Sequence, residues 1–567
     1  MPGIDALVES IFGPIANFLS TVVFYEVPVF GGIPLIVVWL MAAAIFLTVW
    51  LRFQPITGVK HSIDVIRGRF TKKTDPGEVS SFQALATELS GTVGLGNIAG
   101  VAVAIVAGGP GAALWIALFG FFGMSVKMAE ATLGVMFRKV MPDGRTEGGP
   151  MYYLRDGLAS IGFKRTGSVL AVMYAIFALV GVFGAGNIFQ ANQVAAIVSD
   201  AAGVSLLQDN RWILGVVMAL LAGVVILGGV KSIAKWTSAL TPAMAVLYVG
   251  CALAIIIVNI QHLPEAISSI FTGAFTPHGV QGGVIGVAVV GIQRALFSNA
   301  AGVGSAAMAH SASKTKSPAT EGFTAMWEPL VDSIIVCSLT AVAITITGEY
   351  KTGSEDGVAL TSAAFATVAP WFPILLTVAV ALFGFSTILA YEYYGELNAQ
   401  FLFGSKPSVR LGFRIVWVLA VVLGSAASLE SVVAFSDAMF FLMAIPNLLG
   451  IYFLARVLRL EILRHKYRVD TGVIEAIDDP DLRVGMGAHE PTPEQVQAEA
   501  DAERAEADRI RDLHQTLADD PDFPVRAEHH GDDLSSPMGD PEHRIGEEPD
   551  LVSEATDPDS SAAPTGH

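Results

Sequence analysis

The chain has little charge and almost no cysteine. Only 15% of its 567 residues are Asp, Glu, Lys or Arg, and only two are cysteines. Cys251 and Cys337 lie in separate apolar runs, so we expect small buried side chains and not a disulfide or a metal site. A phosphate-binding Walker loop is absent, and so are His/Asp/Glu clusters with metal-ligand or catalytic spacing. These absences argue against an enzyme and against an ATP-driven pump.

Apolar runs dominate what is present. Hydrophobic residues make up 53% of the chain, and the mean hydropathy is +0.57. A run of about 20 apolar residues can cross a bilayer as a helix. The sequence therefore predicts an all-α polytopic membrane protein with eleven transmembrane helices, at 32–52, 82–107, 111–137, 167–198, 211–230, 237–260, 282–310, 321–347, 370–395, 409–428 and 431–457.

Basic residues indicate how these spans are oriented. Lys and Arg gather in alternate loops, as they do on the cytoplasmic side of membranes. The loops left for the outside contain only Arg211 and Lys351. Residues 1–10 carry no basic residue, so no cleavable signal peptide is indicated. We expect a cell-membrane protein with residues 1–31 outside, a transmembrane domain over 32–457, and a cytoplasmic tail over 458–567.

The negative charge of the chain is concentrated in that tail. The net charge is −18, and Asp and Glu greatly outnumber Lys and Arg after residue 470. A segment so acidic and so poor in aromatic residues cannot bury enough apolar surface to fold. We expect the tail to be largely disordered and solubilising; a regulatory or partner-binding tail is the alternative.

Two spans are interrupted where a helix should be continuous. The first interruption is Ser90–Asn97 (SGTVGLGN) and the second is Phe297–Ser305 (FSNAAGVGS). Backbone groups that leave a helix inside a bilayer must be buried in protein or line a polar cavity. Without the first span, the interruptions open two groups of five spans. The sequence therefore predicts a 5+5 inverted repeat, about 82–260 and 282–457, with the binding site at the broken helices.

Several motifs add a resemblance to this pattern. Residues 92–100 (TVGLGNIAG), 147–153 (EGGPMYY), 186–192 (GNIFQAN) and 298–306 (SNAAGVGSA) resemble the alanine or glycine:cation symporter family, in the same order over about residues 80–450. The first break also resembles that of the neurotransmitter:sodium symporters. The resemblance implies sodium-coupled import of alanine or glycine by alternating access. Ala300 stands where the family often has Glu. Proton coupling is the alternative, and a channel is a weaker one, because filters usually need repeated subunits.

A small neutral amino acid brings two charges that the site must match. The helix beginning around Leu95, Gly96 and Asn97 offers amides and a positive dipole end to the carboxylate. Carbonyls freed at the second break could accept from the ammonium group. The residues concerned are Phe297, Ser298 and Gly302. Asn187 and Gln190 either contact the ligand or clamp helices together.

Sodium prefers a compact set of oxygens. The resemblance implies an ion between carbonyls near Ser90 and Val93 and the hydroxyls of Ser386 and Thr387. Those hydroxyls could instead bond their own helix. A second ion could lie near Thr92 and Asn97. The sequence indicates no other cofactor and no nucleic-acid partner.

Charged residues within the predicted spans are expected to form ion pairs, because an unpaired charge is costly inside a membrane. Lys127 and Glu130 are three apart on one helix face, so we expect them to neutralise each other. A second predicted contact joins Arg294 and Glu88, next to the two breaks, as a gate; anchoring at the membrane interface is its alternative. Glu328 and Asp332, on either side of Pro329, are expected near a helix entry, although they are also the best candidates for proton binding.

Overall fold

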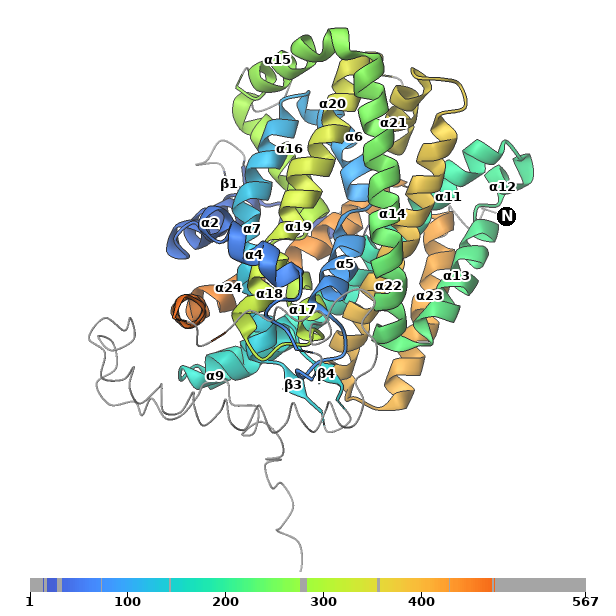
Figure 1. Ribbon diagram of the computed structural model, residues 1–567. Helices are drawn as coiled ribbons and strands as arrows, with labels where there is room; N and C mark the ends of the chain where they lie inside the picture. Colours follow the sequence, from blue (N-terminus) through green and yellow to red (C-terminus); the bar gives the residue numbers. More distant parts are fainter. Residues whose placement is uncertain are drawn as a thin grey trace, which may run out of the picture.

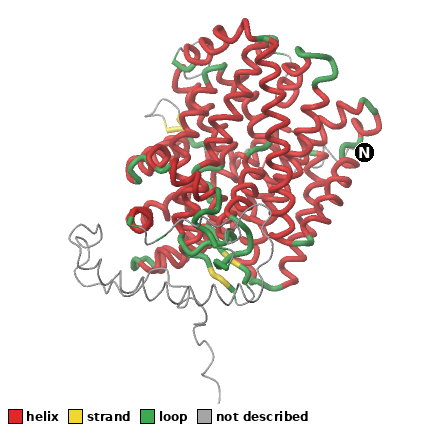
Figure 2. Tube along the Cα trace, viewed as in Figure 1, coloured by secondary structure: helices red, strands yellow, loops and turns green. Residues whose placement is uncertain are grey.

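The fold is almost wholly helical (Figure 2). The computed structural model describes residues 14, 18–27, 33–72, 74–141, 144–275, 283–353, 357–427, 429–471 and 474. Two short antiparallel ladders pair β1 (Glu26–Val27) with β2 (Ile33–Pro34) and β3 (Lys139–Val140) with β4 (Thr146–Glu147). Most of the N-terminal segment and nearly all of the acidic tail lie outside the described residues, so the predicted disorder of the tail stays a prediction.

Within the described residues, seven helices are long and apolar enough to cross a membrane, or eight if one bent pair counts as a span. The seven comprise α7 (Ala112–Met136), α10–η4–α11 (Lys164–Ala202), α14 (Gly229–Val258), α18–α19–η6–α20 (Pro318–Thr347), α22 (Pro373–Phe403), α23 (Pro407–Ala426) and α24 (Leu429–Asp470). The bent pair joins α5 (Ser81–Thr92) to η2 and α6 (Gly96–Gly108) at an angle of 49°.

Shorter apolar helices occupy the remaining predicted spans. They are α2 (Leu35–Trp50), α13 (Trp212–Ile226) and α16 (Gly283–Asn299), with α17 (Ser305–Ser311) following the second break. One apolar helix, α21 (Gly357–Ala366), was not expected. Helix α24 continues to Asp470, so residues 458–470, the first part of the predicted tail, are helical. Between these helices lie α3 (Gln54–Thr57), α4 (Val59–Ile66), α8 (Pro150–Tyr152), η3 (Tyr153–Gly157), α9 (Leu158–Ser160), α12 (Ser205–Asp209), η5 (Ile260–His262), α15 (Leu263–Gly273) and η7 (Glu349–Lys351).

Exposed side chains indicate which helices face lipid. Leu220 and Val224 on α13 are 67% and 76% exposed, and Leu411 and Ile415 on α23 are also exposed. An apolar surface of this kind is rare on soluble proteins, whereas in a bilayer it contacts hydrocarbon. The two helices pack against each other at one side of the molecule (Figure 1).

Buried helices surround the two breaks. Helix α5 packs between α14 and α22, and α7 packs against α16, α17 and α18 (Figure 1). The start of α5 is fixed by a capping box, in which Ser80 and Gln83 each accept the other's backbone N–H. The halves of both broken helices are therefore enclosed by other helices.

Candidate binding site at two helix breaks

The first break releases backbone groups from the helix. After Thr92 the chain leaves helical geometry at Val93 (φ −72°, ψ 93°) and resumes a helix with η2 (Gly96–Gly100). The Gly94 amide, which a continuous helix would direct to the Ser90 carbonyl, donates instead to Asn97 Oδ1 at 2.7 Å. The Ser90 carbonyl is thereby freed. The amides of Leu95 and Gly96 stand at the start of the second half-helix, where the helix itself supplies no acceptor.

The second break diverts its amides in the same way. The Ala301 amide donates to Asn299 Oδ1 at 2.9 Å, and the Gly302 amide donates to Glu130 Oε1 at 2.9 Å. In a continuous helix these amides would bond to the carbonyls of Phe297 and Ser298. Both carbonyls are consequently released. The loop passes through positive φ at Ala300 (54°), an uncommon conformation for a residue with a side chain.

The two breaks touch each other. A Cβ placed on Gly96 would lie 3.1 Å from the Cα of Ser298 and 3.6 Å from the Phe297 carbonyl oxygen. Only glycine allows this approach without a shift of the Ser298 backbone. The structure therefore brings together the residues predicted for substrate binding at Leu95–Asn97 and at Phe297–Ser298.

Asp332 joins the breaks through its side chain. Its Oδ1 accepts from Asn97 Nδ2 at 2.6 Å, and its Oδ2 accepts from the hydroxyls of Ser298 and Ser333 at 2.8 Å each. Asp332 is fully buried in the π-helix η6 (Leu330–Val336). The expectation that Glu328 and Asp332 lie near a helix entry is wrong, because both lie well inside the helical span Pro318–Thr347. Both side chains are 0% exposed. Two carboxylates within an apolar span were the signal for a buried role.

The carbonyl of Gly302, which was expected to accept from the substrate ammonium group, already has a partner in the protein. The Gly302 amide donates to Glu130, and the Gly302 carbonyl accepts from Asn447 Nδ2 at 2.8 Å. Glu130 Oε1 further accepts from the Gly304 amide at 2.9 Å. The protein thus occupies both backbone groups of Gly302. The Glu130 carboxylate therefore caps the start of α17. The start of the half-helix after the first break, η2–α6, is left as the open position for an anion.

The oxygens expected to bind sodium lie together. Thr387 Oγ1 is 2.8 Å from the Ser90 carbonyl, and Ser386 Oγ is 3.5 Å from it. Both hydroxyls are also 2.9 Å from the Phe383 carbonyl of their own helix, as the alternative to ion binding predicts. A Cβ on Gly94, which follows Val93, would lie 3.0 Å from Thr387 Oγ1. Thr92 Oγ1 donates to the Glu88 carbonyl of its own helix at 3.1 Å.

The two amide side chains differ. Asn187 Nδ2 donates to the Trp417 carbonyl at 2.9 Å and so clamps η4 (Gly184–Ile188) to α23. Gln190 Nε2 donates to the Ala185 carbonyl at 2.9 Å. The buried Oδ1 of Asn187 and Oε1 of Gln190 both lack a hydrogen-bond partner among the described residues. Only the Gln190 oxygen is near the first break, 3.9 Å from the position of a Cβ on Gly94. Gln190 is therefore the amide available to a ligand at the first break.

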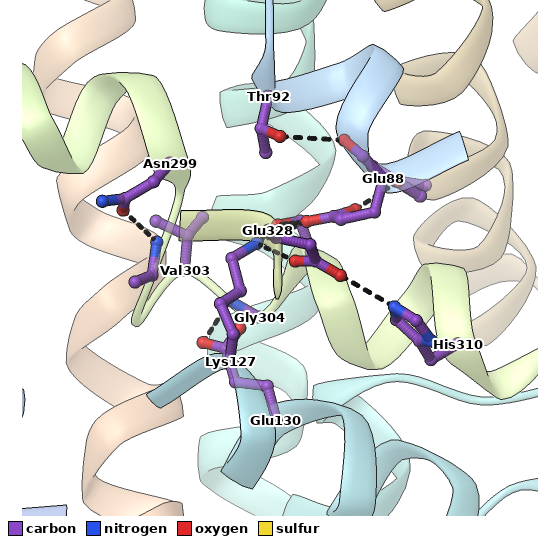
Figure 3. A network of polar contacts seen from close by, with 12 residues as sticks. Glu88, Thr92, Lys127, Glu130, Asn299, Val303, Gly304, His310 and Glu328 are labelled. Atoms are coloured by element: carbon purple, nitrogen blue, oxygen red, sulfur yellow. Dashed lines mark hydrogen bonds and ion pairs between the residues drawn. The ribbon is translucent and has the colours of Figure 1, made fainter. Parts of the chain in front are cut away.

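A buried charge network lies beside the breaks (Figure 3). Lys127 Nζ is 2.5 Å from Glu88 Oε1, 3.2 Å from Glu328 Oε2 and 3.1 Å from Ser305 Oγ. The predicted pairing of Lys127 with Glu130 is wrong, because Lys127 crosses to α5 and α19 (Trp327–Pro329). All these charged side chains are 0% exposed. Lys127 therefore ties both broken helices to α7.

A separate ion pair lies before the second break. Arg294 pairs with Asp437, not with Glu88 as expected, and its guanidinium lies 5.5 Å from the centre of the Phe297 ring. Phe297 also meets Phe189 edge-on, with ring centres 5.2 Å apart. Arg294 precedes the break and Ser305 follows it, so this ion pair and the Lys127 network lie on opposite sides of the break.

Comparison with known proteins agrees with this geometry. The model of the sodium:alanine symporter family matches residues 17–475. The sodium/alanine symporter AgcS of Methanococcus maripaludis is 40% identical over 428 residues, which cover 75% of this chain and 92% of AgcS. GlnT of Bacillus subtilis, described as a probable sodium/glutamine symporter, is 34% identical over 428 residues, which cover 75% of this chain and 86% of GlnT.

A solved structure shares the fold. The crystal structure of MhsT in complex with L-phenylalanine superposes with a TM-score of 0.50 at 13% identity, covering 68% of this chain and 99% of MhsT. The expected likeness to the neurotransmitter:sodium symporter fold is thus confirmed. The relatives are named as symporters, and the chain is a multi-pass membrane transporter and not an enzyme. By its sequence over most of its length, the chain belongs to the sodium:alanine symporter family.

Proposed function

We propose that the protein is a sodium-coupled symporter that imports small neutral amino acids, alanine or glycine, by alternating access across the cell membrane. It has eleven spans with the N-terminus outside and the C-terminus in the cytoplasm, and its core is a 5+5 inverted repeat. The observation that carries this proposal is the contact between the two breaks at Gly96 and Ser298. Amides at the start of one half-helix and carbonyls released from the other broken helix meet there.

The substrate lies along this contact with a defined polarity. Its carboxylate accepts from the amides of Leu95 and Gly96, at the positive end of the half-helix. Its ammonium group donates to the carbonyls of Phe297 and Ser298, or to Gln190 Oε1, which is buried without a partner among the described residues. The reverse orientation is disfavoured because Glu130 already caps the other half-helix.

The walls of the site limit substrate size. Gly96 approaches the Ser298 backbone closely, and the Phe297 and Phe189 rings close the adjoining space. A methyl side chain is the largest group that we expect to be accommodated without moving Phe297. This supports alanine or glycine as the substrate.

Sodium binds between the first break and α22. The hydroxyls of Thr387 and Ser386 lie 2.8 and 3.5 Å from the Ser90 carbonyl. Together with the Val93 carbonyl they offer only oxygen ligands, as a hard cation prefers. A second ion would lie near Asn97, where the Asp332 carboxylate supplies a negative charge.

The two ion-pair groups act as opposite gates. Arg294 and Asp437 close the outer side over Phe297, while Lys127, Glu88 and Glu328 close the cytoplasmic side. Opening one group while the other stays closed exposes the site to one side at a time.

Uptake into proteoliposomes tests the proposal. Labelled alanine and glycine should accumulate under an imposed sodium gradient, and the uptake should stop when choline replaces sodium at a fixed pH gradient. Undiminished uptake in choline would refute sodium coupling. It would support the second candidate, proton coupling, which the buried carboxylates at Glu328 and Asp332 favour.

A further inference from the structure

Glu321 connects α5, the half-helix before the first break, to α17, the half-helix after the second break. These two are called the inner half-helices, because the proposed orientation places them on the cytoplasmic side. Glu321 Oε1 accepts from the Ser81 hydroxyl, at the first residue of α5, at 2.5 Å. Its Oε2 is 2.6 Å from His310 Nδ1, on the last turn of α17. One carboxylate therefore contacts both half-helices, and Glu321 itself lies on α18 (Pro318–Ala325) and is 0% exposed.

His310 is held between two carboxylates. Its Nε2 lies 2.7 Å from Glu328 Oε1, while its Nδ1 faces Glu321 (Figure 3 shows His310 and Glu328). A neutral imidazole has one N–H group, and an ionised carboxylate donates none. Two hydrogen bonds therefore require one more proton than a neutral ring with two carboxylates supplies. The extra proton is on the ring or on one carboxyl group.

Burial makes the extra proton necessary. His310, Glu321 and Glu328 are all 0% exposed, so two uncompensated negative charges would be costly. Lys127 compensates part of this charge through Glu328, but it also pairs with Glu88. Among the described residues, the other ionisable groups that face Glu328 are Glu130 from α7 and Tyr394 from α22. Arg138, after the end of α7, and Tyr393, on α22, contact Ser311 beside His310.

Backbone contacts extend the same link toward the adjacent loops. The Lys314 amide donates to the Val79 carbonyl at 2.7 Å, and the Glu78 amide donates to the Ala312 carbonyl at 2.8 Å. Arg138 donates to the carbonyls of Ser311 and Ser313 at 2.8 and 2.5 Å. The segments next to α5 and α17 thus form one connected unit.

We propose that Glu321, His310 and Glu328 form a proton-binding site that fastens the inner half-helices α5 and α17 together while the proton is bound. When the proton leaves to cytoplasmic water, one imidazole nitrogen presents a lone pair to a carboxylate oxygen, and that contact becomes repulsive. The half-helices then separate more easily. The proton acts as a ligand of the cytoplasmic gate, in addition to the sodium ion proposed to drive transport. The site rests on the proposed function only for which side is cytoplasmic.

Spectroscopy of the purified full-length protein tests for the proton directly. In ¹⁵N-histidine-labelled protein at about pH 7.5, where an exposed imidazole is neutral, the signal lost in His310→Gln should show two protonated nitrogens. If it shows a neutral ring, a protonated carboxyl band that disappears in Glu321→Gln or Glu328→Gln should be present. The exposed His262 is the matched control. A neutral His310 ring without a protonated carboxyl group would overturn the proposal.

Thiol labelling tests the gate without any transport assay. Ala309→Cys introduces a thiol beside His310 at a position that is 2% exposed. The labelling rate of this thiol is divided by that of a free cysteine in solution, which removes the pH dependence of the thiol itself. The normalised rate should rise by up to about tenfold per pH unit over the pH range in which opening of the gate releases the proton. In an Ala309→Cys/Glu321→Gln variant the normalised rate should no longer depend on pH. A normalised rate that has the same pH dependence in both variants would refute the fastening role, whatever the protein transports.

Discussion

Gly96→Ala is the sharpest test of where the substrate binds. The new Cβ would lie 3.1 Å from Ser298 Cα, closer than the usual 3.4–4 Å, and the neighbour is backbone. Overpacking of this kind costs about 1–3 kcal/mol, whereas Ala gains about 1 kcal/mol over Gly in a helix. The net loss of stability is therefore small, about 0–2 kcal/mol. The methyl group would, however, occupy space beside the proposed position of the substrate carboxylate.

We expect alanine affinity to fall at least about tenfold, which corresponds to about 1.4 kcal/mol, with a smaller loss for glycine. Equilibrium binding of both labelled amino acids to the purified protein measures this, and the melting temperature of the same sample monitors folding. Gly100→Ala is the matched control, because a Cβ there meets no atom within 4 Å. It should bind both ligands normally. Normal alanine binding by Gly96→Ala would show that the substrate does not lie at this break.

Three further predictions concern other parts of the chain. Thr387→Ala should raise the sodium concentration for half-maximal uptake without a comparable change in alanine affinity at saturating sodium. Thr377→Ala is the control, because the Thr377 hydroxyl donates to the Pro373 carbonyl of its own helix, and it should leave the sodium dependence unchanged. Equal effects of the two substitutions would contradict the ion site. Burial lowers the pKa of His61, which is 2.8 Å from His465. The neutral ring therefore stabilises the fold above about pH 6.5. The melting temperature should fall as the pH drops below this value, and less so in His61→Phe. Deleting residues from Pro480 onward should leave uptake per folded molecule unchanged, and lost uptake at normal expression would assign the tail a function.

The sequence predicted the helical segments and the two breaks because these are local properties. Apolar run length and the Gly-rich motifs at Gly94–Gly96 and Gly302–Gly304 depend only on neighbouring residues. Helix α21 was missed because it spans only Gly357–Ala366, too short to cross a bilayer. The continuation of α24 to Asp470 was missed because its last turns are charged, although packing keeps Ile462 and His465 buried.

The charged pairs were predicted wrongly because spacing on one helix says nothing about neighbouring helices. Lys127 and Glu130 share a helix face, yet Lys127 contacts Glu88, which lies 39 residues earlier in the chain. Asp332 contacts Asn97 across 235 residues. No single-sequence pattern encodes such contacts, because they depend on how the helices pack. A carboxylate in an apolar span does, however, require a partner, so each one could have been flagged as part of a buried site.

The two breaks have similar sequences but different roles, and the difference comes from Glu130. A half-helix that starts inside a membrane needs an anion or acceptors at its N-terminal amides. At the second break, Glu130 provides them permanently through the amides of Gly302 and Gly304. At the first break, Asn97 satisfies only the Gly94 amide. The half-helix after the first break is therefore the one left incomplete by the protein itself, and we propose that a substrate carboxylate completes it. This asymmetry would give the proposed inverted repeat a single binding polarity.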